Sequence, residues 1–248
     1  RDRSPFGWLH IVRLGLVQAC LGSVVVVTTS TLNRIMVVEL ALPALLPGLL
    51  VGWHYGVQMV RPRLGFGADE GRRSTPWMLG GVVVLALGGI LASVATVWMA
   101  SELWAGMVLA FLAFCLIGLG VSACGTSLLA LMAKRVPDHR RAPAATLVWM
   151  MMIVGFAVTA VTVGKLIDPY SPSVLIQVTT GLACTVVLVA ALSLWGLEGP
   201  VPLPASASPP NSSSAAQEQT SGQRFKQVLQ EVWACLLYTS DAADEEDS

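Results

Sequence analysis

Six long apolar segments constrain the fold of this chain more than any other feature of its sequence. Each is long enough, as a helix, to cross about 30 Å of hydrocarbon. Uninterrupted apolar runs of this length lack the alternation of barrel strands, and a helix satisfies its backbone polar groups internally. We therefore predict an all-α membrane protein with six transmembrane helices. The predicted spans lie near Leu14–Asn33, Leu40–Val60, Trp77–Met99, Ala105–Ala133, Ala145–Leu166 and Val174–Leu197.

The composition agrees with a membrane protein and argues against other classes. Of the 248 residues, 54% are hydrophobic and 12% are charged, which is about half the charged fraction of a soluble domain. The formal net charge is zero, so we expect the lipid bilayer as a partner and no nucleic acid. Most cysteines fall inside apolar runs, and no pair has metal-ligand spacing. We therefore expect no metal site built from cysteines.

Basic residues predict the orientation of the helices. Thirteen of the fifteen lysines and arginines fall on one side of the predicted spans, and the other side has only Arg34 and Lys165. Positive charge concentrates on the cytoplasmic side of membrane proteins, so we predict that both termini are cytoplasmic. The loops predicted to be cytoplasmic are Arg61–Pro76 and Lys134–Pro143. Those predicted to be periplasmic are Arg34–Glu39, Ser101–Glu102 and Lys165–Ser173.

The composition changes outside the spans and divides the chain into five parts. Residues 1–13 form a cytoplasmic N-terminal lead before the bundle of residues 14–198. Residues 199–222 are rich in Pro, Ser and Ala, which is typical of a flexible linker. In residues 223–234 apolar positions recur at helical spacing, which predicts an amphipathic interfacial helix. Residues 235–248 are acidic and resemble a translated sequencing adapter, so we treat them as a non-native tail.

A charged, glycine-rich loop joins the second and third predicted helices. It reads R-P-R-L-G-F-G-A-D-E-G-R-R-S-T-P-W over Arg61–Trp77, and its composition alone also fits an ordinary basic loop. The pattern G-x-x-x-D followed by G-R-R resembles the signature loop of the major facilitator superfamily. The spacing from the aspartate to the arginine pair is one residue shorter than in that superfamily. The resemblance implies a conformational-gate loop that includes Gly65, Asp69, Gly71, Arg72 and Arg73.

The sequence on both sides of this loop resembles a narrower family. The stretch L-N-R-I-M-V-V-E-L-A-L-P-A-L-L-P-G over Leu32–Gly48, H-Y-G-V-Q over His54–Gln58 and T-P-W-M-L-G-G over Thr75–Gly81 are similar to the PucC/LhaA family. That family comprises light-harvesting complex assembly factors, also described as bacteriochlorophyll-delivery members of the superfamily. The similarity runs from about Phe6 to Trp233. The chain then corresponds to an N-terminal half, and a C-terminal six-helix half is missing from this fragment.

The resemblance implies a function, a pigment and a location. The expected function is assembly of photosynthetic light-harvesting complexes, with bacteriochlorophyll bound or delivered and light-harvesting polypeptides as partners. The expected location is the bacterial inner membrane, either cytoplasmic or intracytoplasmic. The alternative is a secondary transporter of a small solute, which normally carries polar groups at mid-membrane. The midplanes of five predicted helices carry no charge, which favours an apolar ligand or protein contacts. We find no catalytic constellation and expect no enzyme.

Two polar side chains at membrane depth form the candidate ligand site. His54 and Gln58 are spaced i, i+4 on the second predicted helix, with Arg61 following at i+7, so all three share a face. Such residues often mark function, and a neutral imidazole can ligate a metal ion, including the magnesium of a bacteriochlorin. In the alternative, His54 forms a packing hydrogen bond to Thr28 or Ser30.

A second polar pair, Arg34 and Glu39, is predicted at the periplasmic face. A separation of five residues is poor for a salt bridge along one helix. We therefore expect these side chains to flank a turn and to extend to water, while the family resemblance leaves a functional role open. Small residues share faces within three of the other predicted helices, which predicts close helix packing. These sets are Gly81, Gly88 and Ala92, then Gly118, Ser122 and Gly125, then Gly155 and Thr159.

Overall fold

The computed structural model describes residues 6–60 and 74–198, and this part of the chain is built from helices. These residues belong to one compact unit, Arg1–Gly199. Several predicted features lie outside the described residues: the conformational-gate loop, the linker, the interfacial helix and the acidic tail. The assignments made for them from sequence stay predictions.

The first helix is longer than its apolar run and continues without a break from Trp8 to Glu39. Its parts are α1 (Trp8–Val26), a π-helical turn at Val27–Thr31, α2 (Leu32–Arg34) and a second π-helical turn at Ile35–Glu39. The predicted span was too short at both ends. The turn predicted at Arg34–Glu39 is wrong, because both residues lie on this helix and the chain reverses at residues 40–44.

Threonine hydroxyls accompany the first of these π-helical turns. The Thr28 hydroxyl donates to the carbonyls of Val24 and Val25, at 3.1 and 3.0 Å. The Thr29 hydroxyl donates to the Val25 carbonyl at 2.7 Å. Side-chain hydroxyls that bond to carbonyls one turn back compete with the backbone ladder and bend helices. These bonds give a local physical reason for the wider turn at Val27–Thr31.

The second apolar run forms a shorter helix than predicted. After a turn in which Ala41 has a φ of 49°, α3 covers Leu45–Val57 and ends in the 3₁₀ turn Gln58–Val60. Thirteen α-helical residues extend only about 20 Å, which is less than the hydrocarbon thickness. We predicted that one helix spans the membrane from Leu40. This prediction is wrong about the first residue of the helix, because α3 begins at Leu45. Five other helices in the described part are long and apolar enough to span.

The remaining helices follow the predicted order. They are α5 (Thr75–Trp98), α6 (Leu103–Arg135), α7 (Asp138–Leu166) and α8 (Pro172–Leu194). The loop predicted at Lys134–Pro143 is wrong, because α6 and α7 are separated only by Val136 and Pro137. His139 therefore lies on a helix. Charged residues outside the hydrocarbon can remain helical, so an apolar run marks the span and not the helix ends.

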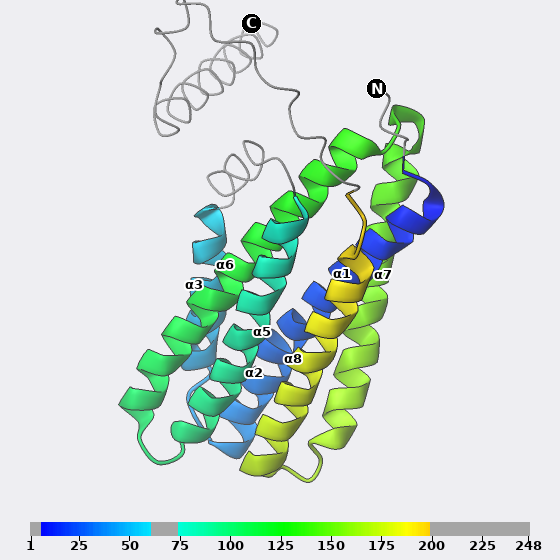
Figure 1. The fold of residues 1–248 in the computed structure, drawn as a ribbon. Coiled ribbons are helices and arrows are strands. Elements are labelled where there is room, and N and C mark those ends of the chain that lie inside the picture. The colour runs from blue at the N-terminus through cyan, green and yellow to red at the C-terminus, as the bar shows by residue number, and fades with distance from the viewer. Residues whose placement is uncertain (1–5, 61–73, 199–248) are drawn as a thin grey trace, which may run out of the picture. The chain divides into compact units, whose positions relative to one another are not determined.

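The helices of the described residues pack side by side, as Figure 1 shows. The helix α6 packs against α5 and α3, α7 packs against α1, and α8 packs against α5 and α1. The first residues of α1, α5 and α7 lie at the same end of the bundle as the last residues of α6 and α8. We call this the basic end, because Arg13 and the cluster Lys134–Arg141 lie there. Arg34 and Lys165 lie toward the opposite end. The distribution of basic residues in the sequence predicted this separation.

Small residues bring the helices close together. Most of the positions that the sequence predicted for close packing have this role. A methyl group added to Gly81 would lie 2.7 Å from the backbone nitrogen of Cys124, and one added to Gly88 would lie 2.8 Å from Ile117. Ala92 on the same face is fully buried. On α6, Gly118 lies against the His54 carbonyl of α3.

One predicted packing position is wrong. A methyl group on Gly125 would meet nothing within 4 Å. Gly125 lies two turns beyond Gly118 along α6, past Val57 where α3 ends. Among the described residues, nothing packs on this glycine.

Hydroxyl groups also join helices inside the bundle. The Thr159 hydroxyl of α7 donates to Ser23 of α1 at 2.8 Å, next to the close approach of Gly155 and Ala19. The predicted packing role of Gly155 and Thr159 is confirmed by these contacts. A similar bond runs from Thr179 of α8 to Ser93 of α5, also at 2.8 Å. Interhelical bonds of this kind contribute on the order of 1 kcal/mol in membrane proteins.

Candidate functional site

The predicted ligand pair on α3 is joined by a direct hydrogen bond. Nε2 of Gln58 lies 2.7 Å from Nε2 of His54. An amide NH₂ group is a donor, so the imidazole nitrogen that faces it accepts the bond. The ring is 1% exposed, and the backbone of the same residue packs on Gly118 of α6. In this arrangement Gln58 lies against the Nε2 side of the imidazole ring.

The alternative partners that the sequence suggested for His54 are wrong. Thr28 directs its hydroxyl to carbonyls of its own helix. Ser30 is exposed, whereas the His54 side chain is buried. The spacing of His54 and Gln58 correctly predicted that they lie together. Whether either residue touches a pigment stays a prediction.

The carboxylate of Glu198, a residue that follows α8 in the sequence, caps the first turn of α5. The two oxygens of Glu198 accept hydrogen bonds from the backbone nitrogens of Ser74 and Thr75, at 3.0 and 2.9 Å. The Thr75 hydroxyl donates to the same carboxylate at 2.8 Å. The first N–H groups of a helix have no intrahelical partner and carry partial positive charge, so an anion there is stabilising. Glu198 therefore ties the segment that follows α8 to the start of α5.

Sequence reasoning missed this contact. Asp69, the acidic residue named in the predicted conformational-gate loop, lies outside the described residues. Glu198 is distant in sequence from Ser74, and no local motif connects them. The available signal was weak: a single acidic residue directly follows the last apolar run.

The end of α8 is also held by a charged side chain. The Arg13 guanidinium of α1 donates from Nε to the Ser193 carbonyl at 2.8 Å, and from Nη2 to the Trp195 carbonyl. Carbonyls at a helix C-terminus carry partial negative charge, so the arginine is favourably placed. Arg13 and Glu198 together link α1, α8 and α5 at the basic end. In the sequence, Arg13 is one of the thirteen basic residues that predict the orientation.

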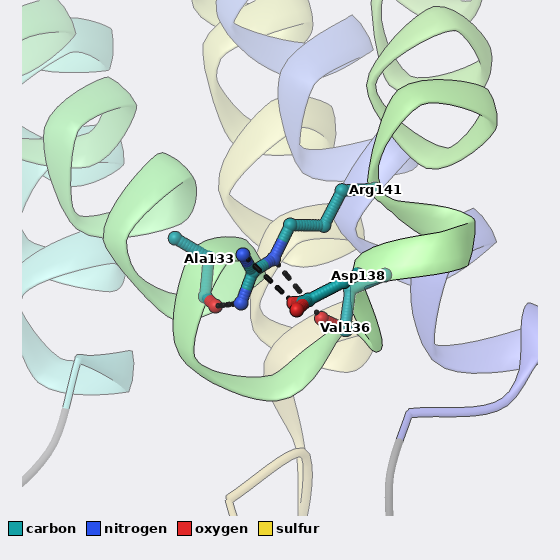
Figure 2. A network of polar contacts seen from close by, with 4 residues as sticks. All are labelled: Ala133, Val136, Asp138 and Arg141. Carbon is teal, nitrogen blue, oxygen red and sulfur yellow. Dashed lines mark hydrogen bonds and ion pairs between the residues drawn. The ribbon is translucent and has the colours of Figure 1, made fainter.

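Arg141 organises the tight connection between α6 and α7, as Figure 2 shows. Its guanidinium donates to the carbonyls of Ala133 and Val136, at 2.8 and 3.3 Å. It also forms an ion pair with Asp138 at 2.9 Å. The arginine thus satisfies carbonyls at the end of α6, while Asp138 lies in the first turn of α7. Both side chains are largely exposed, so the ion pair alone contributes little stability.

The predicted periplasmic pair meets at a small polar pocket. Arg34 and Glu39 line it together with Thr31, Asp168 and Tyr170. Glu39 follows Arg34 across a π-helical turn, in which hydrogen bonds run from i to i+5. Residues five apart are closer to one face there than on an α-helix, which the sequence could not indicate. The volume of about 20 Å³ has room for about one water molecule.

Tyr170 contributes a phenol to this pocket. Burial, and then the negative charge of Glu39, raise the pKa of Tyr170 above its usual value. A raised pKa keeps the phenol protonated at physiological pH, so it acts as a hydrogen-bond donor. The pocket is therefore polar but small and solvent-facing, and it suits water more than an organic ligand.

An apolar groove opens between α5 and α6 near the basic end. Its volume is about 510 Å³, within the range of about 300–1,000 Å³ typical of small-molecule sites. A methyl group added to Gly80 would meet nothing within 4 Å, so this glycine leaves the groove open. No side chain along it is charged. Its lining residues are Pro76, Trp77, Gly80, Gly81, Val84, Leu116, Leu119, Gly120 and Ala123.

Five long apolar helices and a shorter sixth in the described part define an all-helical, multi-pass membrane protein. The pattern of the PUCC protein family matches residues 31–240, and the chain belongs to that family. The family is related to the major facilitator superfamily. Both conclusions confirm the fold class and the family predicted from sequence.

Individual relatives agree with this family. The chain is 47% identical over 230 residues to the "Bacteriochlorophyll synthase 44.5 kDa chain" of Rhodobacter capsulatus, an alignment that covers 92% of this chain and 50% of the relative. It is 30% identical over 201 residues to "Protein PucC" of Rhodobacter capsulatus. It is 29% identical over 200 residues to "Protein PucC" of Cereibacter sphaeroides. Each of these two alignments covers 76% of this chain and 44% of the relative.

The chain spans about half the length of the curated relatives it matches. No solved structure matches this chain. The activity, the ligand and the partners of the whole protein are therefore matters for proposal.

Proposed function

We propose that this chain is the N-terminal half of a membrane assembly factor for photosynthetic light-harvesting complexes that binds or delivers bacteriochlorophyll. Membership of the PUCC protein family supports this proposal, as do the names of relatives, one of which refers to bacteriochlorophyll. The proposal places the protein in the inner membrane of a photosynthetic bacterium. Its partners would be light-harvesting polypeptides and a second six-helix half.

The observation that carries the proposal is the apolar character of the described helices. The helices α5 and α8 contain no charged residue, and in α6 and α7 the charges lie near the helix ends. A charged solute crossing the membrane needs polar groups along its path. A largely apolar pigment needs apolar walls instead, and the groove between α5 and α6 offers them.

We further propose that the protein performs no turnover chemistry. The word "synthase" in the name of one relative describes that protein. Here the polar side chains at helix ends are used for structure: Glu198 caps α5, and Arg13 and Arg141 satisfy helix carbonyls. Binding and transfer of a finished pigment require none of these groups to react.

The full-length parent protein, purified from a pigmented host, tests this function. The absorption spectrum should show co-purifying bacteriochlorophyll, and deletion of the gene should lower the yield of light-harvesting complex. Accumulation of a bacteriochlorophyll precursor in the deletion strain would indicate a biosynthetic step instead. Normal complex yield together with lost uptake of a small solute would favour the transporter alternative.

The proposed orientation has its own test. Cysteines placed at the exposed positions His139 and Ser101, in a background without native cysteines, lie at opposite ends of the bundle. With both termini cytoplasmic, an impermeant thiol reagent added outside should label the cysteine at 101 and leave the one at 139 unmodified until the membrane is opened. Labelling of both positions from the same side would overturn this orientation.

A further inference from the structure

We propose that Arg135 and Arg140, each stacked on an aromatic side chain, bind the phosphate of an anionic phospholipid headgroup at the basic end of the bundle. The inference goes beyond the proposed function and does not depend on it. Arg135 is the last residue of α6, and Arg140 lies in the first turn of α7. The aromatic side chains belong to Phe6, which precedes α1, and to Trp8, its first residue. We call these four residues the headgroup site.

The two aromatic rings hold the guanidinium groups in place. The guanidinium carbon of Arg135 lies 5.6 Å from the centroid of the Phe6 ring, and that of Arg140 lies 6.0 Å from the Trp8 ring. Phe6 is itself fixed, because its backbone nitrogen donates to the Arg135 carbonyl at 3.1 Å and its ring stacks on His10. A cation over the face of a ring is attracted to it. A guanidinium held in this way keeps its N–H donors, which lie in its own plane, available for an anion.

Neither guanidinium has an acidic partner within the described part of the chain. There the side chains of Arg135 and Arg140 form no ion pair and no hydrogen bond. Asp138 is the one carboxylate in the stretch Lys134–Arg141, and it pairs with Arg141 at 2.9 Å. Positive charge is therefore in excess, and both arginines are partly exposed. The planar fork of donors on an arginine matches the oxygens of a phosphate.

The length of α6 places the headgroup site at the membrane surface. Its 33 residues extend about 50 Å, whereas a bilayer with its headgroups is about 40–45 Å thick. The last turn of α6, which contains Arg135, therefore lies outside the hydrocarbon. The hydrogen bond from Phe6 to Arg135 brings the start of α1 to the same level.

Exposed apolar side chains beside the arginines favour a lipid over an acidic protein segment. Trp8 is 49% exposed and Leu9 is 71% exposed, at the start of a helix long enough to span the membrane. Tryptophan is enriched at membrane–water interfaces, and an arginine there keeps its charge among the headgroups while its stem lies on apolar surface. A phospholipid supplies a phosphate for the guanidinium groups and hydrocarbon for these side chains. Anionic lipids of the cytoplasmic leaflet attract basic segments next to membrane helices, which agrees with the predicted orientation.

Native mass spectrometry of the full-length parent protein, titrated with phosphatidylglycerol in detergent, tests the site. The double variant Arg135→Gln/Arg140→Gln removes both charges. The double variant Arg34→Gln/Lys165→Gln removes the same charge at the opposite end and serves as the matched control. Phosphatidylcholine, whose headgroup is neutral overall, and inorganic phosphate, which has no acyl chain, are titrated alongside. The readouts are the affinity of the most tightly bound lipid and the melting temperature of each variant without added lipid.

We expect Arg135→Gln/Arg140→Gln to bind phosphatidylglycerol about 30-fold more weakly than the wild-type protein, at an unchanged melting temperature, and the control to bind it as the wild type does. Unchanged affinity in the arginine variant would overturn the headgroup site, and so would an equal loss in the control. Wild-type protein that binds phosphatidylcholine as tightly would show that the charges are not used. Inorganic phosphate bound as tightly as the lipid would assign the arginines to a free anion and overturn the lipid.

A second variant keeps the proposal testable if the first does not accumulate. Arg135→Lys/Arg140→Lys retains both charges and loses the planar, stacked fork. We expect it to bind phosphatidylglycerol more weakly than the wild-type protein. Affinity equal to that of the wild type would overturn the role proposed for the stacked guanidinium groups.

Discussion

Glycines lie at two helix–helix contacts in this bundle and have a different role in each. Between α5 and α6, Gly81 and Gly120 each lie against backbone atoms of the partner helix. Between α1 and α7, Gly15 and Gly22 of α1 instead receive the side chains of Met151 and Phe156. The same residue type thus brings two backbones together in one place and makes room for a side chain in another.

The difference determines which contact tolerates change. A backbone atom can move only if the helix moves with it, so extra volume between α5 and α6 must separate the two helices. A methionine side chain has several rotatable bonds and fills irregular space, so extra volume between α1 and Met151 can be absorbed locally. We therefore expect the α5–α6 contact to be the rigid part of the bundle, and the groove beside it to keep its shape.

The largest expected effect is at Gly120. In Gly120→Ala the added methyl group would lie 2.6 Å from both the Gly81 oxygen and the Leu85 nitrogen, so α5 and α6 must move apart. Overpacking of this kind costs about 1–3 kcal/mol, and we expect the upper end. The free energy of unfolding, measured by titrating SDS into micelles of the chain, should fall accordingly. A cost no larger than that of Gly15→Ala would contradict the comparison.

An intermediate effect is expected at Gly22. The methyl group of Gly22→Ala would lie 2.6 Å from the Phe156 ring, and a ring has fewer ways to move than a methionine. A loss of about 1–2 kcal/mol is expected in the same SDS titration. The double variant Gly22→Ala/Phe156→Leu should recover part of this loss, because the smaller side chain leaves room. Equal losses in the single and double variants would show that the ring is not the obstacle.

A small effect is expected at Gly15, where the obstacle is the sulfur end of Met151. Gly15→Ala should cost less than about 1 kcal/mol, because a rotamer change costs only a fraction of the overpacking penalty. Thermal unfolding followed by tryptophan fluorescence is a suitable measurement. A loss as large as that of Gly120→Ala would mean that Met151 is held in place as firmly as a backbone.

The smallest effect, with the opposite sign, is expected at Gly125. Nothing lies within 4 Å of a methyl group there, so Gly125→Ala adds no clash. Alanine in a helix is favoured over glycine by about 0.5–1 kcal/mol, and the variant should be as stable as the parent or slightly more so. It is also the matched control for Gly120→Ala, on the same helix. A clear loss would indicate that another part of the protein packs on this position.

Much of the fold could be predicted because hydropathy reports directly on the membrane. The order and number of helices followed from apolar length, and the two ends of the bundle followed from the positions of arginine and lysine. The helix ends could not be predicted in this way, because α7 starts at Asp138 and α1 starts at Trp8, outside the apolar runs. The short length of α3 and the π-helical turns were also missed, since they depend on hydrogen bonding and not on hydropathy.

The candidate site divides in the same way. The spacing of His54 and Gln58 placed them together, because one helix fixes that relation. The cap formed by Glu198 on α5 and the groove around Gly80 needed contacts between helices, which a single sequence does not specify. Gly125 shows the same limit: it shares a face with Gly118, but no described residue packs on it.

The two π-helical turns of the first helix have a further consequence for how its length can vary. Each such turn holds one more residue than an α-helical turn, so it is the local trace of a single-residue insertion. Gly15 and Gly22 upstream keep their partners on α7, and Arg34 and Glu39 downstream keep theirs at the polar pocket. Deletion of one residue within Val27–Thr31 or Ile35–Glu39 would therefore convert a π-helical turn into an α-helical turn. Relatives of different length in this helix should differ at these two stretches before they differ elsewhere along it.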